Sequence, residues 1–182
     1  MPHAGRALID PFRIFKKIGL KEGMRVADMG CGRTGHFVFP AARIVGKTGV
    51  VYAVDVLKDV LENINGWVRS QSWDNIQTIW SDIELLNKTP IPQKSLDVCF
   101  FMNVLFTIKN KVAALSEAAR LLKDDGRIVV VDWSKKLGTL GPTPDTMAEP
   151  KKIVEIAAQC GLSLVENIPV SDYHYCLIFK KI

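Results

Sequence analysis

Short runs rich in β-branched and aromatic residues alternate along this chain with segments in which apolar residues recur every three or four positions. The first kind of run predicts strands over residues 25–29, 50–54, 76–80, 96–102 and 127–133. The second kind predicts amphipathic helices between the strands. Such alternation is typical of a mostly parallel sheet that helices cover on both faces.

The C-terminal part follows a different pattern. Residues 110–123 and the segment that begins at Pro150 each place apolar residues on one helical face, and Gly126 stands beyond the end of the first. Two terminal runs, residues 163–168 and 173–179, are separated by too few residues for a helical crossover. We therefore expect them to pair antiparallel as a hairpin, so that the sheet ends mixed.

Length and composition set the class of protein. The 182 residues, of which 48% are hydrophobic and 24% charged, fit a single soluble globular domain over residues 1–182. No apolar stretch approaches the roughly 18 residues of a membrane span. The start of the chain carries charged residues where a secretory leader would be apolar. We expect a cytoplasmic protein without a membrane span.

Charge and cysteine placement narrow the chemistry. The net charge of +5 could attract nucleic acid, but Lys and Arg are spread along the chain without a basic run, which disfavours that partner. The four cysteines are scattered, with no C-x-x-C pair and no Cys/His cluster at zinc-ligand spacing. The sequence therefore predicts free thiols and no metal site.

The strongest chemical signal is a G-x-G-x-x-G turn formed by Gly30, Gly32 and Gly35, which follows a predicted strand and opens a helix. Glycines at these positions allow a tight turn and let the backbone, including that of Cys31, approach a ligand. Asp55 ends the next predicted strand, where a carboxylate accepts hydrogen bonds from both hydroxyls of a ribose. The pattern predicts a cofactor that contains adenosine.

Asp28 indicates which of the adenosine-containing cofactors the chain binds. It lies two residues before Gly30, where it would repel a pyrophosphate but attract the ammonium group of a methionine moiety. A third acid, Asp82, follows the third predicted strand and could accept from an adenine amino group while Ile83 covers the ring. Three acids at three successive strand ends favour S-adenosylmethionine over NAD.

On these residues the sequence resembles the class I S-adenosylmethionine-dependent methyltransferases over nearly the whole of that family's core. Residues 28–35 match the glycine-rich motif, Asp55 the ribose acid, residues 81–83 the adenine segment and residues 96–103 the fourth-strand motif. The resemblance implies an α/β fold, a Rossmann-like three-layer sandwich whose mostly parallel seven-stranded sheet has an antiparallel C-terminal hairpin strand. It implies S-adenosylmethionine as the cofactor, bound by Asp28, Gly30, Cys31, Gly32, Gly35, Asp55, Val56, Ser81, Asp82, Ile83 and Asn103.

Within the family the sequence is most similar to the ubiquinone and menaquinone C-methyltransferases, through residues 37–56 and the pair Asp132 and Trp133. His36 stands where that branch commonly has Tyr, so the quinone acceptor stays open. Asn103 is not followed by the two prolines and aromatic residue typical of enzymes that methylate amino groups of bases or glutamine, which disfavours those acceptors. The residues expected to line the acceptor site are His36, Phe106, Asp132 and Trp133.

Two segments are expected to cover the site: residues 1–24 as an N-terminal helical cover, and residues 134–149, rich in Gly, Pro and Thr, as a lid loop. No residue stands out as a catalytic base. The predicted function is methyl transfer by in-line attack of a small-molecule acceptor. Two alternatives stay open: a non-catalytic regulatory or interaction protein that binds S-adenosylmethionine, and, less favoured, an NAD(P)-dependent oxidoreductase.

Overall fold

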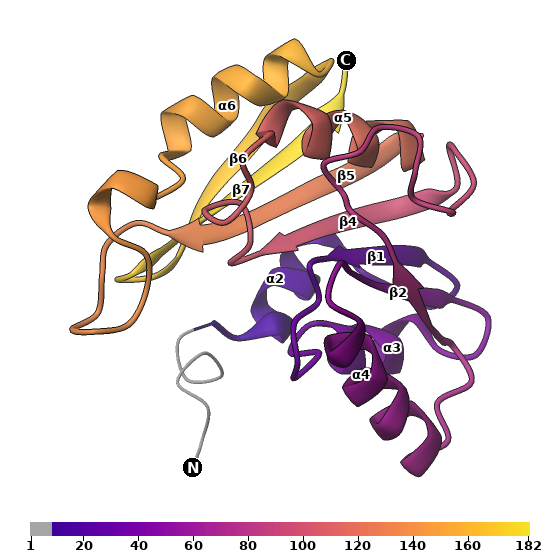
Figure 1. Cartoon of the computed structure of the whole chain (residues 1–182). Helices are drawn as coiled ribbons and strands as arrows, with labels where there is room; N and C mark the ends of the chain where they lie inside the picture. The colour runs from indigo at the N-terminus through magenta and orange to yellow at the C-terminus, as the bar shows by residue number, and fades with distance from the viewer. Residues whose placement is uncertain (1–8) are drawn as a thin grey trace.

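The computed structural model describes residues 9–182, which fold around one seven-stranded sheet (Figure 1). The strands are β1 (Arg25–Met29), β2 (Val50–Asp55), β3 (Ile76–Trp80), β4 (Leu96–Met102), β5 (Leu122–Trp133), β6 (Leu162–Ser171) and β7 (His174–Lys181). The helices are α2 (Pro11–Ile18), α3 (Val38–Val45), α4 (Lys58–Ser70), α5 (Lys111–Leu121), the 3₁₀ turn η1 (Pro144–Thr146) and α6 (Pro150–Gln159).

The strands lie in the order β3-β2-β1-β4-β5-β7-β6. The five strands from β3 to β5 pair in parallel, whereas β7 runs antiparallel to both β5 and β6. The predicted hairpin and the mostly parallel sheet are therefore confirmed. The strand order reverses between β1 and β4, and a ligand crevice forms at the carboxyl ends of the strands at such a point.

Helices cover both faces of the sheet, which confirms the three-layer arrangement (Figure 1). On one face α2, α3 and α4 bury Phe15, Val38 and Ile64 against the sheet. On the other face α5 and α6 bury Leu115 and Ala157. Successive strand residues point to opposite faces, so both layers draw on the same strands.

α2 is short and well capped. Asp10 caps its start by accepting a hydrogen bond from the Phe12 amide at 3.0 Å, and Gly19 ends it in a left-handed conformation. Phe15 on its inner face is fully buried. α2 lies within the segment expected to form an N-terminal cover, and residues 1–8 of that segment lie outside the described residues.

The prediction of a helix between every pair of parallel strands is wrong between β3 and β4. Residues 81–95 make that connection without a helix, and they include Pro90 and Pro92, which lack amide donors and restrict the residues before them. β5 also begins earlier than predicted, because its Leu122 pairs with Leu96 of β4.

Three general features of residues 9–182 bear on function. Within this range no helix combines the length and the apolar content needed to cross a membrane. The four cysteines are free thiols, and Cys31, Cys99 and Cys176 are buried. The same residues contain no group of three or more His, Cys, Asp or Glu side chains arranged to hold a metal ion.

Candidate cofactor-binding site

Two adjoining cavities lie at the carboxyl ends of β1, β2 and β4, where the strand order predicts a ligand crevice. Gly30 and Asn103 line both of them. The β3-side cavity, of about 410 Å³, is lined by Gly30, Asp55, Val56, Leu57, Ser81, Asp82, Ile83, Glu84, Asn103, Val104, Thr107 and Ile108. The α3-side cavity, of about 230 Å³, is lined by Ile9, Asp28, Gly30, Cys31, Gly32, Thr34, His36, Phe37, Met102 and Asn103.

The glycine turn packs tightly against the sheet where the two cavities meet. The Gly30 and Cys31 amides both donate to the Val54 carbonyl, at 2.8 and 3.0 Å. Gly30 and Gly32 have positive φ angles of 87° and 63°, which side chains disfavour. A Cβ on Gly30 would lie 2.5 Å from Cγ2 of Val104. Position 30 therefore requires glycine both for conformation and for space.

Asp28 is a buried carboxylate in the wall of the α3-side cavity. It is 2% exposed, and its Oδ1 has no hydrogen-bond partner among the described residues. Burial, and secondly the charge of Asp55, raise its pKa to about 7. The described residues that line this cavity include no Lys or Arg. A positively charged group on a ligand would therefore supply the partner that Asp28 lacks.

Asp55 ends β2 and faces the β3-side cavity. Its Oδ2 accepts a hydrogen bond from the Gly32 amide at 3.2 Å, and its Oδ1 accepts one from the Leu57 amide at 3.0 Å. These bonds orient the carboxylate and leave each oxygen a further lone pair for a ligand hydroxyl. Val56 follows at the cavity wall with 51% of its surface exposed.

The segment after β3 forms another wall of the β3-side cavity. The Ser81 amide donates to the Asp55 carbonyl at 3.1 Å, which joins this wall to the end of β2. Oδ1 of Asp82 accepts from the Glu84 amide at 2.9 Å, a local turn contact that Asp commonly makes. Ile83 is buried and lines the cavity. This wall thus presents an acid and an apolar surface side by side.

Asn103 lies between the two cavities in an unusual conformation. Its φ is +53°, its amide donates to the Val131 carbonyl at 2.8 Å, and its Oδ1 is buried with no partner in residues 9–182. A left-handed conformation at a non-glycine residue and an unpaired buried oxygen both destabilise the fold. Such unfavourable features are commonly found at functional sites. Asn103 lines both cavities, which makes it a candidate ligand contact.

Of the four residues expected to line the acceptor site, His36 alone lines one of these cavities. Its Nε2 lies 2.9 Å from the Ile9 carbonyl, which links the glycine turn to the segment before α2. Asp132 is fully buried, and its carboxylate accepts from the Phe106 and Trp133 amides at 3.2 and 2.8 Å. Burial raises its pKa to about 6. Asp132 thus holds the loop after β4, and neither it, Phe106 nor Trp133 lines the two cavities.

Gly35 also lies outside both cavities and has a packing role, because a Cβ there would lie 2.7 Å from Phe39 and 2.9 Å from Ile64. Sequence reasoning missed several lining residues, most of which stand within two positions of a motif residue. They are Ile9, Thr34, Phe37, Leu57, Glu84, Met102, Val104, Thr107 and Ile108.

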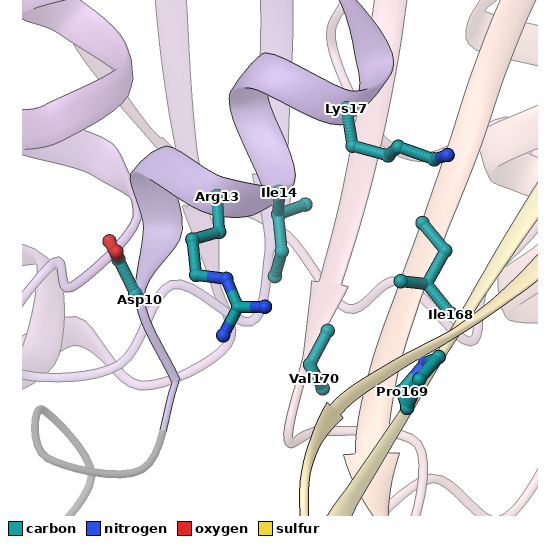
Figure 2. Close-up of a pocket in the computed structure, with 7 residues that line it drawn as sticks. All are labelled: Asp10, Arg13, Ile14, Lys17, Ile168, Pro169 and Val170. Atoms are coloured by element: carbon teal, nitrogen blue, oxygen red, sulfur yellow. The ribbon is translucent and has the colours of Figure 1, made fainter.

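A separate cavity of about 150 Å³ lies between α2 and the end of β6 (Figure 2). Ile9 lines the α3-side cavity and the next residue, Asp10, lines this one, so both cavities adjoin the segment just before α2. None of the expected cofactor residues lines it. Its walls are formed by Asp10, Arg13, Ile14, Lys17, Ile168, Pro169 and Val170.

Comparison with known proteins points to one family. A family model described as a methyltransferase domain matches residues 20–168. A demethylmenaquinone methyltransferase of Staphylococcus aureus is 29% identical over 123 residues, covering 68% of this chain and 48% of that protein. An aklanonic acid methyltransferase of Streptomyces is 31% identical over 136 residues, covering 73% of this chain and 60% of that protein. The chain thus spans about half the length of these curated relatives.

The fold is shared with a solved structure over nearly the whole chain. A methyltransferase from Aquifex aeolicus, described as S-adenosylmethionine-dependent, superposes with a TM-score of 0.89 and is 25% identical. The match covers 99% of this chain and 94% of that protein. The likeness therefore extends over nearly all of both chains.

Proposed function

This chain belongs to the methyltransferase-domain family, and on that premise we propose that it binds S-adenosylmethionine and transfers its methyl group to a small-molecule acceptor. The observation that carries the proposal is the buried Asp28 carboxylate, which lines a cavity without Lys or Arg among the described residues and whose Oδ1 has no hydrogen-bond partner there. A methionine ammonium group would complete this site, whereas a pyrophosphate would be repelled.

The residues of the two cavities fit the parts of this cofactor in order. Asp28 would pair with the ammonium group, and Asp55 would accept from the ribose hydroxyls. Asp82 would accept from the adenine amino group, with Ile83 against the ring. The glycine turn would lie along the connecting chain, because Gly30 lines both cavities. Each assignment uses a group that the structure leaves facing a cavity.

The chain's contribution to the reaction is orientation and exclusion of water. When bound, S-adenosylmethionine supplies a methyl group on a positively charged sulfur, and the carbon–sulfur electron pair stays on sulfur as the acceptor bonds to the carbon. Holding donor and acceptor in line can supply much of the rate. Burial raises the pKa of the Cys31 thiol, which keeps it protonated and unsuited to act as a nucleophile.

The acceptor side of the site favours a small organic molecule with apolar surface. Ile9, Phe37 and Met102 line the α3-side cavity beside His36. The two curated relatives are named for demethylmenaquinone and for aklanonic acid. We propose an acceptor of this broad kind, which the apolar residues would position over the methyl donor.

Calorimetry with the whole chain tests the cofactor assignment. We expect S-adenosylmethionine and S-adenosylhomocysteine to bind at least 100-fold more tightly than NAD or NADP, roughly 3 kcal/mol, because the dinucleotides place phosphates near Asp28. Equal or tighter binding of NAD would overturn the proposal in favour of an oxidoreductase. A screen of small-molecule acceptors with methyl-labelled cofactor tests the transfer step, and tight binding without turnover would favour a regulatory protein.

We also propose that residues 134–149 and the start of α2 cover the site as a lid. The 134–149 segment is held near its middle, where Gly141 packs on the Trp133 ring, and near its end, where the Tyr175 hydroxyl donates to the Ala148 carbonyl at 2.6 Å. Most residues between 134 and 147 are exposed. The segment contains the short 3₁₀ turn η1 but no α-helix or strand, and connections of this length are often functional covers.

The lid proposal predicts a change in hydrogen exchange. Amides of 134–149 should exchange several-fold more slowly when S-adenosylhomocysteine and an acceptor identified by the screen are both bound, because closure excludes water. Amides of β4 and β5, which are already in the sheet, serve as the internal control. Unchanged exchange in 134–149 and in residues 9–12 with both ligands bound would refute the lid.

A further inference from the structure

The connection between β3 and β4 builds one wall of the β3-side cavity, yet it contains no helix to hold its shape. Residues 81–84 of this connection carry the proposed adenine contacts. Exposed loops without regular structure generally have low local stability. The position of Ser81 and Asp82 therefore depends on contacts made from elsewhere in the fold.

Glu117 of α5 anchors the middle of this connection. Its side chain is fully buried. Its Oε2 accepts from the Asn87 amide at 2.8 Å, and its Oε1 accepts from the Thr89 amide at 2.9 Å. Arg120, one helical turn later, donates to the same two oxygens at 2.8 and 2.7 Å. One carboxylate thus joins two loop amides and a guanidinium.

Burial alone would raise the pKa of Glu117, but hydrogen bonds from Arg120 and from the Asn87 and Thr89 amides outweigh it and lower the pKa to about 2. Glu117 therefore stays ionised at neutral pH. Charge-assisted hydrogen bonds are roughly twice as strong as neutral ones, so the carboxylate holds the loop firmly.

Thr89 connects Glu117 to a residue that lines the cavity. Its backbone is held at both polar atoms, because the amide donates to Glu117 and the carbonyl accepts from Arg120 at 3.1 Å. Its Oγ1 lies 3.1 Å from Oγ of Ser81, in a buried contact. Ser81 in turn donates its amide to Asp55. A continuous series of contacts runs from α5 to the residue that precedes Asp82.

We propose that Glu117 and Arg120 are positioning residues which act through Thr89 and Ser81 to place Asp82, and thereby set the preference of the site for adenine. The inference rests on the proposed function, since it assigns the β3-side cavity to the nucleoside. In this role, Glu117 and Arg120 do not touch the ligand. Glu117 and Arg120 line neither cavity.

The test compares two ligands in one variant: S-adenosylhomocysteine, and S-inosylhomocysteine, in which an oxo group replaces the adenine amino group. The parent should prefer the adenine compound, because Asp82 attracts the amino group and repels the oxo group. Thr89→Val keeps the size of the side chain and the backbone bonds but removes the contact with Ser81. We expect it to reduce the preference about fivefold or more, with weaker S-adenosylhomocysteine binding.

Glu117→Gln is a second test of the positioning role, because it removes the charge and one acceptor but keeps the size of the side chain. It should shift the ligand preference in the same direction. Asp124→Asn is the control, because it breaks an exposed ion pair with Lys94 at the other end of the same connection, and neither residue lines a cavity or lies in the proposed lid. This control should leave both affinities unchanged.

The outcomes are distinct. An unchanged preference in both folded variants, with only their thermal stability lowered, would overturn this inference and leave the cofactor assignment standing. Failure of the parent to bind S-adenosylhomocysteine would overturn the proposed function, and this inference with it. A reduced preference in Thr89→Val and Glu117→Gln, absent in the control, would support the positioning role.

Discussion

We expect Gly30→Ala to abolish measurable cofactor binding and to lower the free energy of unfolding by roughly 2–5 kcal/mol, the sum of a left-handed alanine and an overpacked contact. The backbone at Gly30 has φ +87°, and the added Cβ would lie 2.5 Å from Cγ2 of Val104. Relief of that overlap must displace Val104 or the turn, and both line the β3-side cavity.

Gly32→Ala is the matched control. Gly32 stands two positions away with φ +63°, but a Cβ there meets nothing within 4 Å. It should cost only the conformational part, about 1–2 kcal/mol, and should leave cofactor binding measurable. Chemical denaturation and calorimetry with S-adenosylhomocysteine measure both quantities.

The double variant Gly30→Ala/Val104→Ala separates the two causes. Removal of the valine methyl groups should restore part of the stability but none of the conformational cost at position 30. Equal losses in Gly30→Ala and Gly32→Ala would show that the close contact with Val104 contributes nothing.

Much of the fold was predictable because its determinants are local. The predicted bounds of β1, β3 and β4 agree with the structure, since each is a short run of β-branched or apolar residues between turns. The hairpin of β6 and β7 followed from the shortness of its connection. The glycine turn and Asp55 could be recognised in the sequence because the tight turn requires glycine at fixed positions and the acid follows at a fixed distance.

The parts that sequence reasoning missed depend on distant contacts. Residues 87–89 take their shape from Glu117, which lies 28 to 30 positions away along the chain. β5 gains its first residue by pairing with Leu96 of β4, which no local pattern reveals. Asp132 lies near the end of a strand, as expected, and a carboxylate there can either contact a ligand or bond within the fold. In the structure it accepts a buried hydrogen bond from the Phe106 amide. Local patterns predict which residues reach a strand end and not which way they point.

The buried Asp28 carboxyl group should make the stability of the ligand-free protein depend on pH. Its pKa is raised from 3.8 to about 7, first by burial and secondly by Asp55. A carboxyl group whose pKa is raised in the folded state stabilises the fold fully below its unfolded pKa, and that contribution is lost as the pH rises through the folded pKa. The ligand-free protein should therefore lose stability between about pH 4 and 7, by an amount on the order of 4 kcal/mol from this group. Asp28→Asn should remove that part of the pH dependence.

Cofactor affinity should change with pH in the opposite direction. The ammonium group pairs with the ionised carboxylate, so the dissociation constant of S-adenosylhomocysteine should fall roughly tenfold per pH unit up to about pH 7 and then level off. At pH 8, Asp28→Asn should bind about 100-fold more weakly than the parent, as expected when one partner of a buried charge pair is lost. At pH 5 the two proteins should bind almost equally, because the parent's carboxyl group is then protonated.

Calorimetry from pH 5 to 8 measures whether the affinities of the parent and of Asp28→Asn become equal at low pH. A variant of His36 is the control that identifies which group titrates. His36 lines the same cavity, and an imidazole ordinarily titrates in the same range. His36→Gln should therefore keep the full pH dependence if Asp28 is its source. Loss of the dependence in His36→Gln, together with its persistence in Asp28→Asn, would transfer the titration to the imidazole and leave the ammonium group without its proposed partner.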